Sequence, residues 1–130
     1  MFTLFTLLNV SLEGLTPTLN QMYRNASLKV RYKTKKTREY QDYAVALMQK
    51  SKSMPFAFEG RVWVKVEFFV ANKRKWDLDN RFKVLFDCLQ LAEVIKDDSQ
   101  IDFIYAERSF SGETKTVITV YGLEQKNGQE

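Results

Sequence analysis

The feature that most constrains the fold is a strict alternation of apolar residues in the middle of the chain. Residues 62–70 read VWVKVEFFV, with valine or phenylalanine at every second position. Because successive side chains of a strand point to opposite faces of a sheet, this spacing predicts a strand with one buried face. Such a face is stable only when a second layer covers it, so the chain is expected to form a layered sheet domain.

Two segments carry apolar residues at the spacing of an amphipathic helix. The stripes are Tyr40, Ala44, Leu47 and Met48 in the first segment and Leu85, Cys88, Leu89 and Ala92 in the second. We expect Thr37 to cap the first helix, which continues to about Lys50, and Asp79 to cap the second. Both stripes are interpreted as core packing.

Further strands are predicted around these helices. A short strand at residues 10–12 leads into a proline-containing loop at residues 16–20, and the basic segment 29–38 is expected to be extended. Two strands at residues 101–110 and 115–121 are joined at Ser111-Gly112.

The order of these elements predicts an α+β fold in which two main helices pack on a mixed or antiparallel sheet. With 130 residues, the chain is expected to form one domain over residues 1–123, followed by a polar tail at residues 124–130. The apolar residues at positions 2–8 fit either an edge strand or a subunit interface.

The residue types present exclude several chemistries. The chain has no histidine and a single cysteine, Cys88, so it has neither a Ser-His or Cys-His nucleophilic pair nor an imidazole metal ligand. Cys88 cannot form an internal disulfide and is expected to be a buried core residue in a reducing compartment. The uncharged N-terminus lacks the basic region of a signal peptide and is too short to span a bilayer, which predicts a cytoplasmic protein without a membrane partner.

The net charge of +4 is unevenly distributed. Residues 77–102 carry seven acidic and three basic side chains, a net charge of −4, and the remaining residues carry +8. A basic surface attracts a polyanion such as DNA, whereas an acidic island repels it unless a cation neutralises the carboxylates. A divalent metal ion would do so.

The basic residues fall into two groups that are candidates for DNA binding. Alternate positions in the first group would share one face of an extended segment, although a solvated edge strand would show the same pattern. The second group directly precedes the acidic island. The two groups are Lys29, Arg31, Lys33 and Lys35, and Lys73, Arg74 and Lys75.

The acidic residues form a candidate metal site. Asp77 and Asp79 lie two residues apart after the central strand, and Asp97 and Asp98 follow the second helix. Carboxylates without histidine or cysteine match the oxygen ligands that Mg²⁺ or Mn²⁺ prefers, and phosphodiester hydrolysis is the reaction that such a site predicts. Caps, turn openers and surface ion pairs would give the same residues.

Three further polar residues extend this patch along the second helix. Asn80, Lys83 and Asp87 share a helical face with Asp79. Lys83 is expected to position a phosphate or to stabilise charge that develops on it.

The segment WDLDNRFKVLFDCLQLAEVIKDDSQI, residues 76–101, resembles the signature of the RusA family of Holliday junction resolvases. In that signature a D-x-D-N-x-x-K motif opens a helix and a D-D-x-Q motif follows it. In the N-terminal loop, Thr16-Pro17 and Asn20-Gln21 stand where the family tends to have Pro-Pro and Asn-Arg.

The resemblance implies a Mg²⁺-dependent endonuclease that nicks four-way DNA junctions symmetrically as a homodimer, in a family often encoded by phages and prophages. It implies that Asp77, Asp79 and Asp98 bind the metal and that Lys83 is the essential lysine. Asp87 and Asp97 would be supporting acidic residues, and no small-molecule cofactor is expected.

Two other functions remain open at the level of sequence. One is a non-catalytic nucleic-acid-binding module whose acidic residues are caps and turn residues. The other is a nuclease that acts on flaps, replication forks or RNA.

Overall fold

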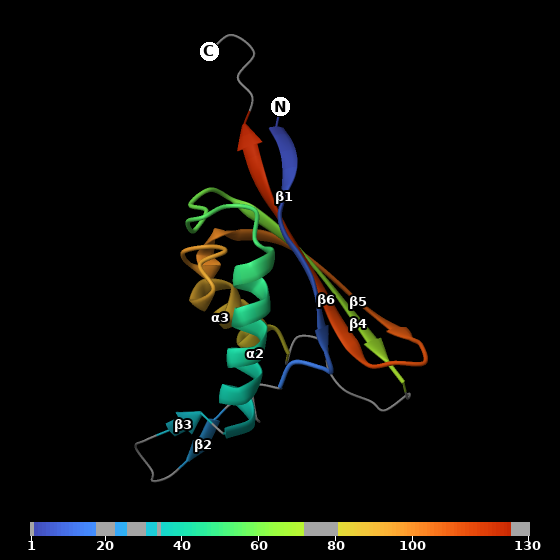
Figure 1. The fold of residues 1–130 in the computed structure, drawn as a ribbon. Coiled ribbons are helices and arrows are strands. Elements are labelled where there is room, and N and C mark those ends of the chain that lie inside the picture. Colours follow the sequence, from blue (N-terminus) through green and yellow to red (C-terminus); the bar gives the residue numbers. More distant parts are fainter. Residues whose placement is uncertain (1, 18–22, 26–30, 34, 72–80, 126–130) are drawn as a thin grey trace.

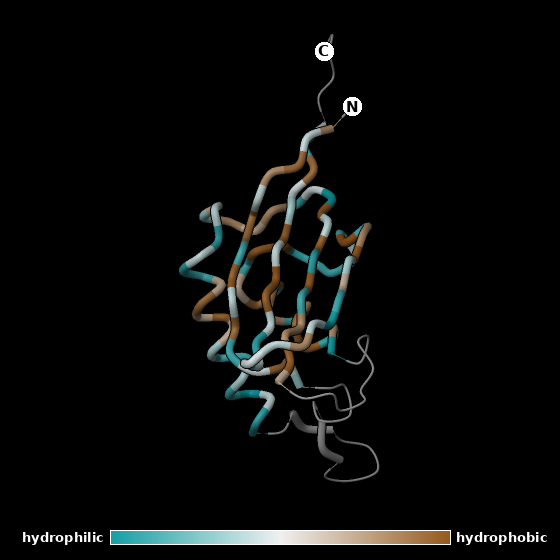
Figure 2. Tube along the Cα trace, turned by 90° about the vertical axis from the view of Figure 1, so that its right-hand side faces the viewer, coloured by the Kyte–Doolittle hydropathy of each residue, from teal (hydrophilic) through white to brown (hydrophobic). Residues whose placement is uncertain are grey.

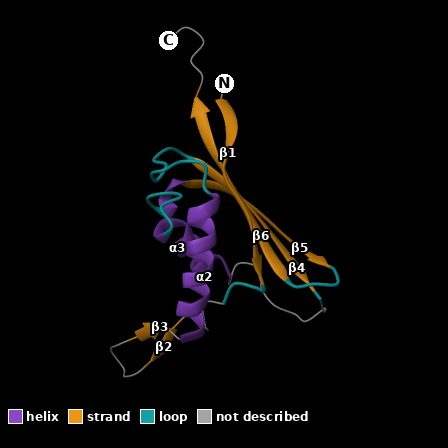
Figure 3. Ribbon diagram, viewed as in Figure 1, coloured by secondary structure: helices purple, strands orange, loops and turns teal. Residues whose placement is uncertain are grey.

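In the computed structural model, the structure describes residues 2–17, 23–25, 31–33, 35–71 and 81–125. Within them, a four-stranded mixed sheet in the order β1-β6-β4-β5 has two α-helices packed on one face (Figures 1 and 3). The predicted α+β fold with a mixed sheet and two helices is therefore confirmed. The elements are β1 (Phe2–Glu13), β2 (Tyr23–Asn25), β3 (Arg31–Lys33), α2 (Lys35–Ser51), β4 (Val62–Val70), α3 (Phe82–Leu91), the 3₁₀ helix η2 (Asp98–Gln100), β5 (Ile101–Phe110) and β6 (Lys115–Gln125).

The central strand is β4, with the bounds that the alternation predicts. It pairs parallel with β5 and antiparallel with β6, and its apolar positions from Val62 to Val70 are buried while those between them are half-buried. The alternation of hydrophobic and hydrophilic residues along the strands is visible in Figure 2. The parallel pairing with β5 follows because α3 carries the chain back across the sheet between the two strands.

β1 is longer than the strand predicted at residues 10–12. The apolar N-terminal residues continue it back to Phe2, and it forms an edge of the sheet beside β6. The register shifts between Thr6 and Leu8, and this irregularity lets both Leu7 and Leu8 face the core. At Gly122, opposite Phe5, an added Cβ would lie 2.5 Å from the Phe5 ring, so any side chain at this position would displace that ring.

Both helices pack their predicted stripes against the core, although Tyr40 and Leu47 of α2 are only partly buried, and α2 does not begin where a cap was expected. Ala44 and Met48 of α2 are fully buried, and so are the predicted positions of α3. α2 begins at Lys35, so Thr37 is a buried residue of its first turn; lysine is a good helix former and extends the helix backwards. The N-cap position of α3 is Arg81, without a side-chain cap hydrogen bond, and Asp79, the expected cap, lies outside the described residues.

The basic segment does not form one extended face. β3 pairs with β2 in a short hairpin beside the start of α2, a strand pair that the sequence did not predict, and Lys35 already belongs to α2 (Figure 1). Lys29 lies outside the described residues. β5 has its predicted bounds, whereas β6 continues four residues past the expected end at Tyr121. Among the helices that the structure describes, none is both long and apolar enough to cross a membrane.

Candidate active site

The turn between α3 and β5 carries two of the predicted acidic residues. α3 ends at Leu91, and Glu93 follows with a left-handed φ of 59°. Asp97 then caps η2: its carboxylate accepts a hydrogen bond of 2.9 Å from the backbone N–H of Ser99. These contacts reverse the chain so that Asp98 opens η2, directly before β5 begins at Ile101 opposite Val62, the first residue of β4.

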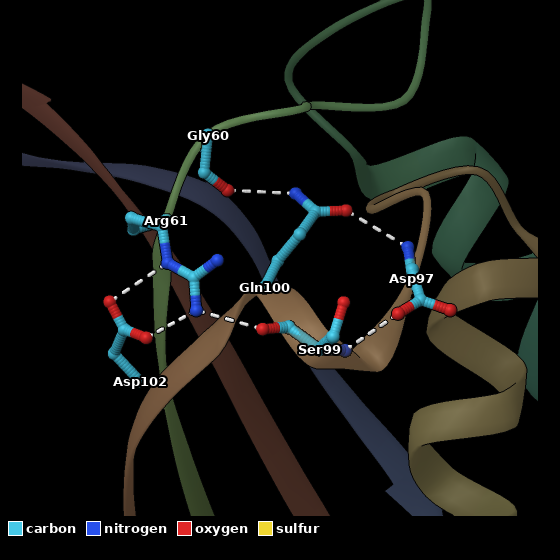
Figure 4. A network of polar contacts seen from close by, with 6 residues as sticks. All are labelled: Gly60, Arg61, Asp97, Ser99, Gln100 and Asp102. Atoms are coloured by element: carbon cyan, nitrogen blue, oxygen red, sulfur yellow. Dashed lines mark hydrogen bonds and ion pairs between the residues drawn. The ribbon is translucent and has the colours of Figure 1, made fainter.

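Gln100 connects this turn to the segment before β4 (Figure 4). Its Oε1 accepts hydrogen bonds from the backbone N–H groups of Lys96 at 2.8 Å and Asp97 at 2.9 Å. Its Nε2 donates to the carbonyls of Phe58 and Gly60, both at 2.7 Å. The side chain is 6% exposed, so all four hydrogen bonds lie in a largely dry environment where they are costly to lose.

Arg61 holds the same turn from its solvent side. Its Nη2 donates to the backbone carbonyl of Ser99 at 2.8 Å and to the Asp102 carboxylate, and its Nε donates to Asp102 at 2.9 Å. The hydrogen bonds from Arg61 lower the pKa of Asp102, and the same contact raises the pKa of Arg61. Both side chains are exposed, so this bidentate ion pair adds little to the free energy of unfolding, and its main effect is to orient the Arg61 guanidinium toward the turn.

The two neighbouring carboxylates of the turn differ in what they contact. Hydrogen bonds from the side chain and backbone of Ser99 lower the pKa of Asp97, and the nearby Lys83 ammonium lowers it further. Within the described residues, the partly exposed Asp98 carboxylate makes no hydrogen bond or ion pair. Asp97 therefore shapes the turn, and Asp98 has its oxygen atoms available to a ligand.

Lys83 and Asp87 lie on the polar side of α3. Lys83 Nζ is 3.1 Å from Asp87 Oδ1, an ion pair between residues one helical turn apart. The helix α3 that carries both residues also contacts η2, the 3₁₀ helix that Asp97 caps. The structure thus brings Lys83, Asp87 and Asp97 into one neighbourhood, with Asp98 on the same turn.

Several predicted site residues lie outside the described residues. They are Asp77, Asp79 and Asn80 of the acidic motif, and Lys73, Arg74 and Lys75 before it. The described part of the chain holds no group of three or more acidic, histidine or cysteine residues that could bind a metal ion. The proposed ligand set is therefore represented here by Asp98 alone.

The sequence analysis missed two contacts that shape this region. Arg81 Nη1 donates to the carbonyl of Thr16 at 2.6 Å, and the buried Thr16 hydroxyl donates to the carbonyl of Arg81 at 3.1 Å. This pair ties the loop after β1 to the start of α3, and no spacing rule links residues 65 positions apart. The hydrogen bond between the Gln100 side chain and the Asp97 N–H could have been predicted, because Asp97 and Gln100 have the D-x-x-Q spacing of a capping box.

Comparison with protein families finds one match. The family model for endodeoxyribonuclease RusA matches residues 14–121, which include both helices and every described strand except β1 and the last four residues of β6. Comparison with curated proteins finds no match. Because the family match spans most of the chain and includes the turn described above, the chain belongs to the RusA endodeoxyribonuclease family.

Proposed function

We propose that this protein is a Mg²⁺-dependent endonuclease that resolves four-way DNA junctions by paired symmetric nicks, with Mn²⁺ as a substitute metal. The family match over residues 14–121 carries the proposal. The turn between α3 and β5 supports the proposal. A catalytic carboxylate must be held in a fixed position, and Asp98 lies on this turn between backbone groups that Gln100 and Arg61 hold by hydrogen bonds.

The donor set fits a hard cation. The ligands would be Asp77, Asp79 and Asp98, all carboxylates, and Mg²⁺ and Mn²⁺ prefer oxygen ligands. When bound, the metal supplies Lewis-acid activation of the scissile phosphate and of the attacking water.

The chain's own residues would orient and neutralise the substrate. Lys83 is the side chain that would stabilise negative charge developing on the phosphate, and its ion pair with Asp87 would direct its ammonium. The DNA backbone would be held by Lys29, Arg31, Lys33, Lys35, Lys73, Arg74 and Lys75.

Two symmetric cuts require two sites, so we propose a homodimer. The sheet face opposite the helices supplies a candidate interface, which we call the open face. A hollow of about 320 Å³ lies there, lined by Leu4, Trp63, Val64, Lys65, Phe103, Tyr105, Glu107 and Tyr121.

The composition of the open face favours a second copy over DNA. Leu4, Phe103 and Tyr105 are 40–49% exposed, and large exposed apolar patches mark protein interfaces. Lys65 Nζ lies 3.9 Å from Glu67 Oε1 on this face, so the face carries both signs of charge. The positive charge on one copy can therefore lie opposite the negative charge on the other. The carboxylates of the open face would repel a phosphate backbone.

The metal assignment is tested by Asp79→Asn and Asp98→Asn. Each variant should lose junction cleavage while keeping junction binding, because each removes a metal ligand but no proposed DNA contact. Glu93→Gln is the matched control, an exposed acidic residue on the turn after α3 that is not a proposed ligand. Cleavage by the Asp79 and Asp98 variants at the rate of the control would contradict the mechanism.

A further inference from the structure

The amide of Gln100 is shared between two segments that are far apart in the sequence. Residues 58–60 precede β4 and residues 96–97 follow α3, and the one side chain hydrogen-bonds backbone groups of both. Only an amide side chain fits this position, because two backbone N–H groups need an acceptor there and two backbone carbonyls need a donor. Glutamate would place a carboxylate oxygen against the two carbonyls, and an apolar side chain would leave four backbone groups without this partner.

The backbone is held by hydrogen bonds at the residue before Asp98 and at the residue after it. On one side, Gln100 holds the N–H of Asp97. On the other side, Ser99 is held twice, through its N–H by Asp97 and through its carbonyl by Arg61. The Asp98 carboxylate makes no hydrogen bond or ion pair within the described residues, so the contacts that hold it there are those of the backbone on either side.

We propose that Gln100 is a positioning residue that sets the metal affinity of the site by fixing the backbone on either side of Asp98. This inference rests on the proposed function, since it takes Asp98 as a metal ligand. Groups that orient a ligand without touching the metal commonly change metal affinity by roughly 10-fold to 100-fold. Gln100 would act through Asp98 and would not contact the substrate.

The test compares Gln100→Met with Gln41→Met. Gln41 is also 6% exposed but lies on α2, outside this network, so it controls for the loss of a buried amide. Mn²⁺ binding is measured by electron paramagnetic resonance on the folded, DNA-free protein, and hydrogen exchange is measured over residues 96–101. The Mg²⁺ concentration for half-maximal junction cleavage is measured in parallel.

We expect Gln100→Met to raise the Mn²⁺ dissociation constant and the half-maximal Mg²⁺ concentration about 10-fold or more. Exchange at residues 96–101 should accelerate, and cleavage at saturating Mg²⁺ should be largely recovered. Gln41→Met should leave the metal constants at their wild-type values. A role in stability alone would lower the melting temperature of Gln100→Met without changing either metal constant, and that result would overturn the proposal.

Arg61→Gln provides a second variant in case Gln100→Met does not fold. Its side chain is exposed, and the change removes the guanidinium contact to the Ser99 carbonyl. It should shift Mn²⁺ affinity in the same direction by a smaller factor, and wild-type affinity in this variant would count against the backbone positioning of Asp98. Asp98→Asn separates the two proposals: if it binds Mn²⁺ like the wild type, the metal site itself is wrong. If it loses Mn²⁺ while Gln100→Met and Arg61→Gln keep it, only the positioning role fails.

Discussion

At the scale of single residues, the neighbouring acidic residues Asp97 and Asp98 have different surroundings. The Asp97 carboxylate accepts a hydrogen bond from the N–H of Ser99, whereas the Asp98 carboxylate makes no hydrogen bond or ion pair with the residues that the structure describes. The difference follows from position, because the residue before a 3₁₀ helix has the extended backbone that lets its side chain turn back onto the helix. Asp97 is thus a supporting residue through the shape of the turn.

The lowered pKa of Asp97 predicts a pH-dependent contribution to stability. Because the pKa in the folded protein lies below the ordinary value of 3.8, the charged carboxylate stabilises the fold above that value. The contribution is lost as the pH falls through the lowered pKa. Asp97→Asn keeps an N-cap but removes the charge, so in urea unfolding it should be less stable than the wild type at pH 7, and this deficit should shrink as the pH is lowered progressively below 3.8. A deficit that does not shrink would show that the charge is not the cause.

At the scale of elements, α3 joins the core to the site. Its apolar side packs into the core through residues that include Leu85 and Leu89, and its polar side carries Lys83 and Asp87. The position of Lys83 therefore depends on how the opposite side of the helix packs.

Two leucines of α3 provide a matched test of this packing. Leu89 is fully buried and Leu91 is 55% exposed. Leu89→Ala should lower the free energy of unfolding by about 2–5 kcal/mol, because it leaves a cavity under the helix. Leu91→Ala should change it by less than about 0.5 kcal/mol. Urea denaturation of both variants measures the difference, and similar losses would mean that α3 does not pack through this side.

The elements also show how far the sequence alone predicts the fold. Strand β4 and the stripes of α2 and α3 were predicted because apolar residues that repeat at the period of a strand or a helix lie on the one side of that element that is buried. The β2–β3 hairpin and the start of α2 at Lys35 were not predicted, because short polar segments have no such spacing. Of the site, the sequence predicted the acidic residues but not the contacts of Gln100, since those depend on residues 58–60 being folded against the turn.

At the scale of the whole molecule, the layers have different roles. The helices cover one face of the sheet, and α3 contributes to the candidate site (Figure 1). The open face carries exposed aromatic residues such as Phe103, whose ring centroid lies 5.1 Å from that of Trp63. Paired symmetric cuts are most simply made by two copies of a domain that nicks one strand, and this is the reason for the proposed homodimer. We propose the open face as the surface through which the two copies associate.

Light scattering tests the proposed dimer. The wild type should have twice the 15.3 kDa mass of the chain, and Phe103→Lys should have the mass of a monomer because it places a charge on the open face. Phe56→Lys is the control, since Phe56 is 63% exposed but lies between α2 and β4, away from the open face. A dimer in both variants would move the interface elsewhere.

The most direct test of the proposed function is cleavage of a labelled four-way DNA junction, compared with linear duplex, a flap and a fork, in Mg²⁺ or EDTA. The account predicts paired symmetric nicks in the junction, only with Mg²⁺, and little cleavage of the other substrates. Preferred cleavage of the flap or fork would keep the nuclease but contradict junction resolution. Intact strands in every lane, with the junction shifted on a native gel, would contradict catalysis and indicate a DNA-binding module.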